Sequence, residues 1–178
     1  MISLGEKFPS FNKKCVISTE VGKEFSDITS EDHIKEGKWM IMFWYPKDFT
    51  FVCPTEIVEF NNNIEEFNKR NVKLVAASTD SEYVHLAWRM NHKGLKELKF
   101  PMLADTSKSL AEELGILTND EKVAYRVTFI VDPEGTIQWI CANNLDVGRN
   151  VNEVVRVLDA LQTGALTPCN WVSGQKTL

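Results

Sequence analysis

The chain has 178 residues, 43% of them hydrophobic, and a formal net charge of -5. This length suits one α/β domain with a sizeable core. The 20 basic and 25 acidic side chains are interspersed, without a basic stripe, so we expect no nucleic-acid partner. We expect no membrane partner, because the longest apolar run, residues 39–45, is too short to cross a bilayer. The N-terminal residues do not resemble a secretory signal, which predicts a cytoplasmic location.

The hydrophobic pattern predicts strands and helices that alternate along the chain. Periodicity indicates strands at 39–45, 72–78, 126–132 and 136–142, and helices at 54–69, 81–93, 107–114 and 151–161. In the helix at 81–93, Val84 and Trp88 would face the core, and Asp80 or Ser81 would cap the start.

The stretch DPEG at 132–135 is typical of a tight turn between antiparallel strands. We therefore predict an α/β protein with a thioredoxin-like fold: a central mixed β-sheet flanked by helices, with a C-terminal tail. No linker divides the chain, so we expect a single domain over 1–178, with 163–178 as its C-terminal arm.

Four cysteines are present, and their spacing argues against a metal site. Cys15, Cys53, Cys141 and Cys169 form no CxxC pair, and none of the three histidines clusters with them. We therefore expect no metal site, and in particular no structural zinc. In a reducing compartment such thiols are either inert or chemically used. Cys15 and Cys141 are expected to be structural, although spacing alone leaves both open as disulfide partners.

Cys53 stands directly before a proline at the start of a predicted helix. Proline suits the first helical position, which would make Cys53 the N-cap residue. Free backbone N–H groups and the helix dipole then favour the thiolate over the thiol. Glu56 lies where a capping-box glutamate reaches back to the cap. A cysteine before a proline is nevertheless more often a small buried residue, so its neighbours must decide.

Ionisation of Cys53 alone would not make an enzyme. Complete ionisation raises the thiolate fraction of an ordinary thiol at pH 7 by only about 30-fold. The remaining acceleration needs donors that align an electrophile and stabilise the charge that develops. Thr50 lies three residues earlier, and Arg126, which opens a predicted strand, is the best-placed cation. Taken alone, Thr50 would be a cap and Arg126 a surface charge.

The segment PKDFTFVCPTE contains PxxxTxxC, which resembles the active-site signature of the peroxiredoxins. Five separate segments resemble the typical two-cysteine group, in particular its alkyl hydroperoxide reductase C (AhpC) type: TFVCPTE, AASTDSEYVHLAW, FPMLAD, RVTFIVDPEG and VGRNVNEVVRVLDALQ. The resemblance implies a thiol-dependent peroxidase that reduces hydrogen peroxide and organic hydroperoxides without a cofactor of its own.

The resemblance also implies roles for individual residues. Cys53 would be the peroxidatic cysteine, which becomes a sulfenic acid. Pro46 would shield its sulfur, Thr50 would hydrogen-bond the peroxide, and Arg126 would activate both thiolate and substrate. Glu56 and Arg149 match positions that orient this arginine and complete the charge network. Trp88 matches an aromatic residue near the site, but core packing explains it equally well; His85 and Asp146 are expected to be structural.

A two-cysteine peroxidase needs a second, resolving cysteine that forms a disulfide with the first. Here it must come from far along the chain, because the segment CPTE offers no local partner. The tail carries Cys169, and a flexible tail can deliver a thiol to its own protomer or to a neighbour. The resemblance implies a neighbour, hence a homodimer, with dimers assembling into a ring that is a decamer or a dodecamer. The family's resolving cysteine usually stands four residues before a tryptophan. Here Thr167 holds that place relative to Trp171, and Cys169 stands only two before.

A subgroup served by alkyl hydroperoxidase D carries cysteines at both places, and this chain looks closest to that subgroup. We therefore assign Cys169 as resolving, with a tail thiol that has no role as the alternative. An external dithiol protein would recycle the disulfide: one resembling alkyl hydroperoxidase D, a flavoprotein disulfide reductase or thioredoxin. Two other functions are open, a thiol-disulfide oxidoreductase, which the CxxE sequence disfavours, and an oligomeric holdase chaperone.

Overall fold

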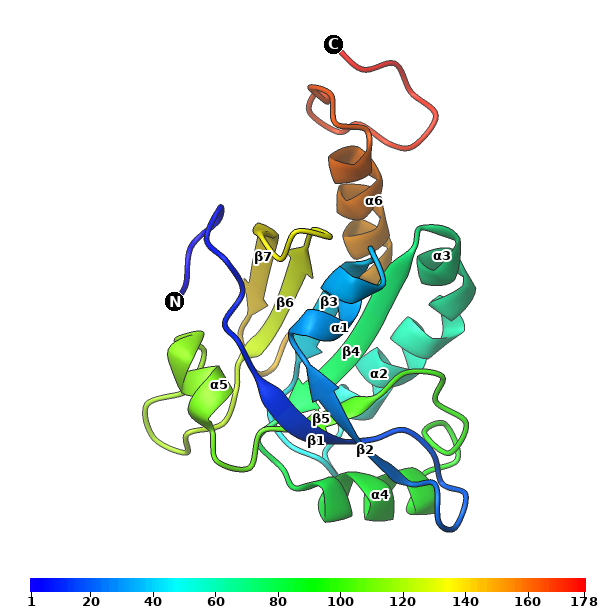
Figure 1. Ribbon diagram of the computed structural model, residues 1–178, viewed down its shortest axis with the longest axis vertical. Coiled ribbons are helices and arrows are strands. Elements are labelled where there is room, and N and C mark those ends of the chain that lie inside the picture. Colours follow the sequence, from blue (N-terminus) through cyan, green and yellow to red (C-terminus); the bar gives the residue numbers. More distant parts are fainter.

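The computed structural model describes residues 1–178. Seven strands form one sheet, and six helices lie against it (Figure 1). The elements in chain order are β1 (Asn12–Val16), β2 (Phe25–Thr29), α1 (Glu31–Lys35), β3 (Trp39–Trp44), α2 (Val52–Asn62), α3 (Ile64–Lys69), β4 (Val72–Ser78), α4 (Glu82–Asn91), β5 (Met102–Ala104), α5 (Ser109–Glu113), β6 (Arg126–Val131), β7 (Ile137–Asn143) and α6 (Val151–Gln162). None of the helices is long and apolar enough to cross a membrane.

The sheet is mixed, as the sequence predicts. Its strand order is β2-β1-β5-β4-β3-β6-β7. The three central strands β5, β4 and β3 are parallel, and β1, β2, β6 and β7 each pair antiparallel with their neighbours. The loop after β3 leads into α2, so it leaves the carboxyl end of a parallel strand, where α/β folds place their sites.

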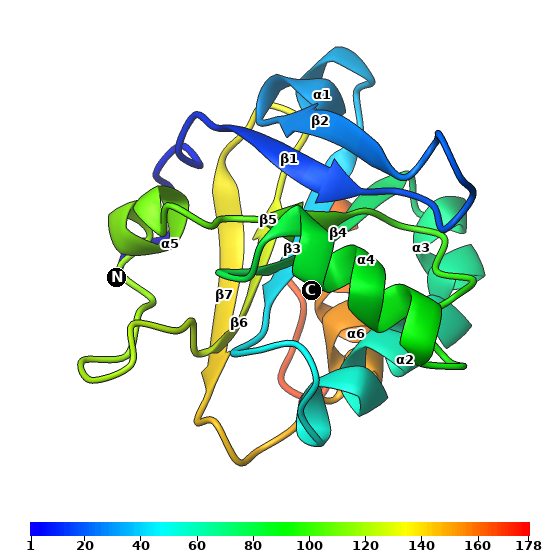
Figure 2. The same cartoon turned by 90° about the horizontal axis from the view of Figure 1, so that it is seen from below.

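Two apolar layers cover the two faces of the sheet. In β3, alternate side chains point to opposite faces: Ile41 and Phe43 join one buried cluster, and Met40 and Met42 join the other. The first cluster also contains residues of α2, α3, α4 and α6, and the second contains the N-terminal segment and α5. Figure 2 shows these helices on either side of the strands.

The long predicted elements are confirmed, with one interruption. The predicted helix 54–69 is divided into α2 and α3 at Asn63, whose φ and ψ of -95° and 9° are not helical. The Asn63 amide donates to the Glu59 carbonyl oxygen at 2.9 Å, and such side-chain bonds compete with helical ones. At Ser81, the predicted cap of α4, the hydroxyl accepts a bond from the Val84 N–H at 3.3 Å. Val84 itself is 36% exposed, so its predicted place on the buried face of α4 is wrong.

Four short elements have no counterpart in the prediction: β1, β2, α1 and β5. The strands β1 and β2 are largely polar because β2 is the edge strand and β1 lies next to it, and the first three residues of each are not buried. The helix α1 has only five residues, and β5 has only three. Elements this short carry too few residues to display a period.

Candidate active site

Cys53 lies in the first turn of α2 and is 1% exposed. The helix begins at Val52 with Phe51 as N-cap, so the predicted N-cap position of Cys53 is wrong by two residues. Pro54 is still tolerated, because the first N–H groups of a helix have no intrahelical partner. The sulfur therefore remains at the positive end of the helix dipole, as the sequence predicts.

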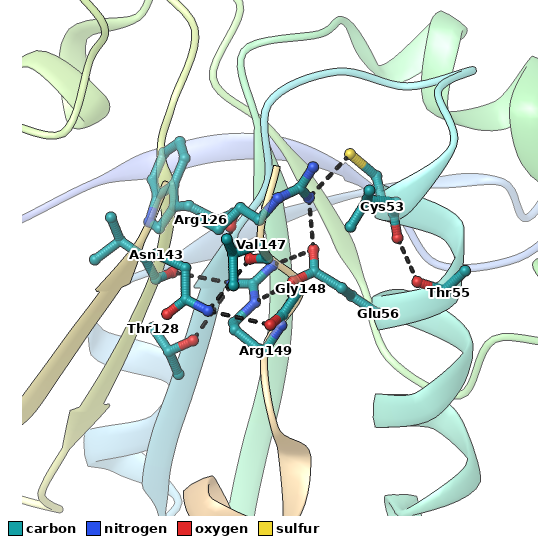
Figure 3. Close-up of polar contacts among 12 residues, drawn as sticks. Cys53, Thr55, Glu56, Arg126, Thr128, Asn143, Val147, Gly148 and Arg149 are labelled. Atoms are coloured by element: carbon teal, nitrogen blue, oxygen red, sulfur yellow. Dashed lines mark hydrogen bonds and ion pairs between the residues drawn. The ribbon is translucent and has the colours of Figure 1, made fainter. Parts of the chain in front are cut away.

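Arg126 reaches Cys53 from the start of β6. Its Nη1 donates to the Cys53 Sγ at 3.4 Å and to the Glu56 Oε2 at 2.7 Å (Figure 3). Its Nε donates to the carbonyl oxygen of Leu145 at 2.7 Å. These bonds fix the plane of the guanidinium group. Its Nη2 has no hydrogen-bond partner and is left for a molecule in the cavity beside it.

Glu56 does not act as a capping-box residue. Its carboxylate turns inward and lies between two guanidinium groups (Figure 3). The Nε and Nη2 atoms of Arg149 donate to the two Glu56 oxygens at 2.9 and 2.8 Å, and the Arg149 backbone N–H adds a bond of 3.0 Å. Two charged partners stabilise a buried carboxylate more than one backbone N–H would.

Arg149 is anchored on several sides. Its Nη1 donates to the Trp44 carbonyl oxygen at 2.8 Å and to the Thr128 hydroxyl at 3.3 Å, and its guanidinium carbon lies 5.2 Å from the centre of the Phe43 ring. The side chains of Arg126, Glu56 and Arg149 are 5%, 2% and 2% exposed. Two guanidinium groups and one carboxylate leave one net positive charge beside the sulfur, which stabilises negative charge on it.

A cavity of about 230 Å³ opens above the sulfur. Pro46 and Thr50 line it, from the loop between β3 and α2, together with Cys53 and Arg126. The Thr50 hydroxyl donates to the Lys47 carbonyl oxygen at 2.9 Å, so its oxygen can still accept a bond from a ligand. Polar groups and apolar walls therefore meet at one small chamber. The apolar walls include Val123 and Leu145, neither of which the sequence singles out.

The structure separates Cys169 from this cluster. Cys169 is exposed in the tail that follows α6 (Figure 1), and all four cysteines are free thiols. Trp171 anchors this tail: it is 3% exposed, and its carbonyl oxygen accepts a bond from Arg156 Nη1 at 3.0 Å. Within one chain, Cys169 thus belongs to a folded tail that turns back against α6 at Arg156, and no residue of this tail lines the cavity beside Cys53.

The remaining sequence candidates lie in the core or at its margin. Trp88 is 3% exposed and packs 6.1 Å from Tyr45 and 5.9 Å from Phe49, ring centre to ring centre, which favours core packing. Burial, helped by the charge of Asp27, raises the pKa of the Cys15 thiol to about 11. Burial also raises the pKa of Cys141, although the charge of Arg149 opposes the shift. Neither thiol lines the cavity above Cys53.

Comparison with known proteins gives consistent matches over the chain. The model of the AhpC/TSA family matches residues 4–140. The chain is similar to alkyl hydroperoxide reductase C of Mycobacterium tuberculosis, at 45% identity over all of this chain and 94% of the relative. It is also similar to the putative peroxiredoxin YkuU of Bacillus subtilis, at 42% identity over 98% and 97% of the two chains.

Solved structures match the whole fold. The structure of Mycobacterium bovis AhpC matches with a TM-score of 0.87 at 45% identity, over 96% of this chain and 98% of that one. The reduced 2-Cys peroxiredoxin of Plasmodium vivax matches with a TM-score of 0.90 at 33% identity, over 98% and 91%. These matches confirm the predicted fold class.

Proposed function

This chain belongs to the AhpC/TSA family of peroxiredoxins, and on that premise we propose that Cys53 carries its thiol-dependent reduction of peroxides. The observation that carries this assignment is the bond between Arg126 and the Cys53 sulfur, beside a cavity that Thr50 and Pro46 also line. The substrates are hydrogen peroxide and organic hydroperoxides.

The first step is a nucleophilic displacement at oxygen. The Cys53 thiolate attacks one peroxide oxygen, an S–O bond forms as the O–O bond breaks, and water or an alcohol leaves after taking a proton. The sulfur is oxidised to a sulfenic acid and the peroxide is reduced. The free Nη2 of Arg126 would donate to the peroxide, Thr50 would accept a hydrogen bond from its protonated oxygen, and Pro46 would exclude water. Glu56 and Arg149 would hold Arg126 in place.

The second step is disulfide formation with Cys169 from a neighbouring protomer. Cys169 would attack the sulfenic acid sulfur and release water. Two observations support a neighbour. The tail leaves α6 at the end away from Arg149, and Arg156 in the middle of that helix holds the carbonyl oxygen of Trp171, so the tail lies against α6 and lines no part of the Cys53 cavity. Because Cys53 is 1% exposed, the first turn of α2 must open for this step. A dithiol reductant then restores both thiols.

The finer identity of the partners belongs to this proposal. A protein resembling alkyl hydroperoxidase D, a flavoprotein disulfide reductase and thioredoxin are the candidate reductants. A homodimer is supported by β7, the last strand of the sheet, whose outer edge bonds to the N-terminal segment only at Ile137 and is unpaired beyond it. We propose that the dimers form a ring, a decamer or a dodecamer, and that residues 1–178 are one domain with 163–178 as its arm. The cytoplasmic location stays a prediction.

A peptide map under non-reducing conditions tests this cycle. After one equivalent of peroxide we expect a Cys53–Cys169 disulfide in the native chain and a Cys53 sulfenic acid in Cys169→Ser. A link from Cys53 to Cys15 or Cys141, or no link at all, would overturn the resolving assignment. Cys53→Ser should abolish peroxide consumption. Peroxidase activity that survives in Cys53→Ser would overturn the central proposal, whereas a holdase would keep its chaperone activity in that variant.

A further inference from the structure

A buried acid and a buried histidine meet behind the loop that leads into α2. The carboxylate of Asp48 accepts a bond from the Tyr45 hydroxyl at 2.8 Å on Oδ1, and its Oδ2 lies 2.7 Å from His85 Nδ1. The side chains of His85 and Asp48 are 0% and 1% exposed. Neither residue takes part in the chemistry described above.

The second ring nitrogen of His85 determines where hydrogens must be. His85 Nε2 lies 3.1 Å from the carbonyl oxygen of Leu103 on β5, which can only accept, so Nε2 carries a hydrogen. The short contact between Nδ1 and the carboxylate then requires a further proton. The pair therefore shares one proton, either as imidazolium and carboxylate or as imidazole and carboxylic acid.

The charges around the pair favour keeping this proton. Burial lowers the pKa of His85, but the hydrogen bond to Asp48 and its charge outweigh burial, and the pKa is raised overall. Burial raises the pKa of Asp48, against the effect of His85. The other titratable groups that face the pair are Tyr45 at the end of β3 and Asp80 after β4, and neither can supply a positive charge.

Asp48 is the main tether of the loop at 45–51. Its backbone N–H donates to Asp80 Oδ2 at 3.0 Å, which also accepts from the Ser78 hydroxyl at 2.7 Å. The loop therefore connects through one residue to α4, to the end of β4 and to β5. Three further links join this loop to distant segments. At its start the Tyr45 N–H donates to the Ala77 carbonyl oxygen at 3.0 Å, and near its end Phe49 packs against Trp88. Lys47 forms an ion pair with Glu121, whose side chains are 45% and 59% exposed. An exposed ion pair of this kind stabilises little, so within residues 46–50 the buried hydrogen bonds of Asp48 are the main polar tether.

The tethered loop carries two residues of the peroxide cavity. Pro46 and Thr50 stand two residues to either side of Asp48, and both line the chamber above Cys53. We propose that Asp48 and His85 are positioning residues, whose shared-proton hydrogen bond holds Pro46 and Thr50 where a peroxide lies in line with the Cys53 sulfur. This inference rests on the proposed role of Cys53.

The expected size of the effect follows from the geometry of displacement. A misplacement of about 1 Å at a reacting centre can cost about 100-fold in rate. In His85→Phe both bonds of the ring are lost. We expect the rate constant for oxidation of Cys53 by hydrogen peroxide, followed by stopped-flow tryptophan fluorescence at pH 7, to fall by about 10-fold to 100-fold. Alkylation of Cys53 by iodoacetamide, which needs no aligned peroxide, should not fall.

Asp48→Asn serves as the conservative variant. Its amide can donate to Nδ1 of a neutral His85 while its oxygen accepts from Tyr45, so the tether survives without the shared proton. We expect it to keep its rate within about 3-fold of the native chain at pH 7, since its hydrogen bonds are retained. As the pH rises through the raised pKa of His85, the native pair loses its proton and two acceptors face each other. The ratio of the native rate to the Asp48→Asn rate should therefore fall at alkaline pH.

The outcomes separate this inference from the proposed function. His92→Asn, at the end of α4, should leave the rates of Cys53 oxidation and of Cys53 alkylation unchanged. An unchanged peroxide rate in folded His85→Phe, with Cys53→Ser inactive, would overturn the positioning role and keep the peroxidase. A parallel fall of oxidation and alkylation would also overturn it, because general thiol reactivity would then have changed. If His85→Phe does not fold, the Asp48→Asn ratio decides: a ratio that is constant with pH would overturn the proposal.

Discussion

At the scale of single residues, the charge balance around Glu56 connects stability to reactivity. Its carboxylate is the only acidic group that pairs with Arg126 and Arg149, and all three side chains are nearly inaccessible. The same residue therefore neutralises a buried cation and aims the guanidinium group that contacts the Cys53 sulfur. A change at this position must affect both properties.

Glu56→Gln should destabilise the fold and slow the reaction. Two guanidinium groups would remain buried with no negative partner, and breaking a buried pair in this way costs about 3–5 kcal/mol. Chemical unfolding measures this loss, and single-turnover oxidation of Cys53 should slow with it, because Arg126 loses its orientation. As a control, Glu65→Gln changes an exposed pair with Lys99, and should cost less than about 1 kcal/mol. Equal stability of the two variants would contradict the charge balance described here.

Cys15 should give the fold a specific alkaline sensitivity. Burial raises its pKa from 9.0 to about 11, so the folded state favours the thiol. The stabilisation that the folded state gains from keeping this thiol protonated is complete below pH 9.0. It is lost as the pH rises through about 11, because the thiol ionises first in the unfolded chain. The difference in unfolding free energy between the native chain and Cys15→Ala should therefore be constant below pH 9.0 and shrink between pH 9.0 and about 11. A difference that stays constant would mean that Cys15 does not ionise differently in the two states.

Single residues also show which parts of the site can be predicted from the sequence. The place of Arg126 at the start of an apolar strand makes it a candidate cation, and the family resemblance supplies its role. The pattern alone gives no reason to choose Arg149, which only the resemblance indicates. Glu56 has the spacing of a capping residue, because local spacing reveals a possible capping box but not a distant cation. The tether of Asp48 to His85 joins residues 37 positions apart, which no period in the sequence encodes.

At the scale of elements, α2 and α6 frame the site between their first turns. Asn150 caps α6 directly after Arg149, and its side-chain oxygen accepts a bond from the Glu153 N–H at 3.2 Å. This cap ends the loop that brings Arg149 to Glu56. The start of α6 is therefore part of the support for the charge cluster.

Asn150→Ala should lower the free energy of unfolding by about 1 kcal/mol, because the first turn of α6 loses its cap. In a chain of this size that corresponds to a thermal midpoint lower by about 2–4 °C. Asn150→Asp restores an equivalent acceptor and should remain close to the native chain. A midpoint for Asn150→Ala that equals that of Asn150→Asp would show that the cap is not needed.

The sequence predicts long elements better than their ends or their breaks. Strands β3, β4, β6 and β7 are recognisable because six or seven consecutive residues carry the pattern. The break between α2 and α3 escapes the pattern because both halves keep the same apolar face, with Phe60 and Phe67 in one cluster. The spacing of the apolar residues predicts which face of a helix is buried. A single asparagine that bonds to the backbone can interrupt the helix without changing that face.

At the scale of the whole molecule, the two opposite edges of the sheet are largely unpaired. The strand β7 is the last in the order and β2 the first. At the β2 edge, Phe25 contacts Tyr83 of α4 with ring centres 5.3 Å apart. These two side chains, 38% and 68% exposed, form an apolar patch at this edge. Two different self-complementary contacts on one protomer are what a ring of dimers requires.

Tyr83→Glu should divide the proposed ring into dimers. A charge placed inside an apolar contact loses its hydration without gaining a partner, while pairing through β7 is untouched. Sedimentation velocity should give one species of dimer mass for this variant and a much larger species for the native chain. Leu4→Glu, which adds the same charge at another exposed apolar residue, 62% accessible, should sediment like the native chain. If Tyr83→Glu retains the native mass, the apolar patch does not join the dimers, and if the native chain is itself a monomer, the ring and the shared disulfide fail together.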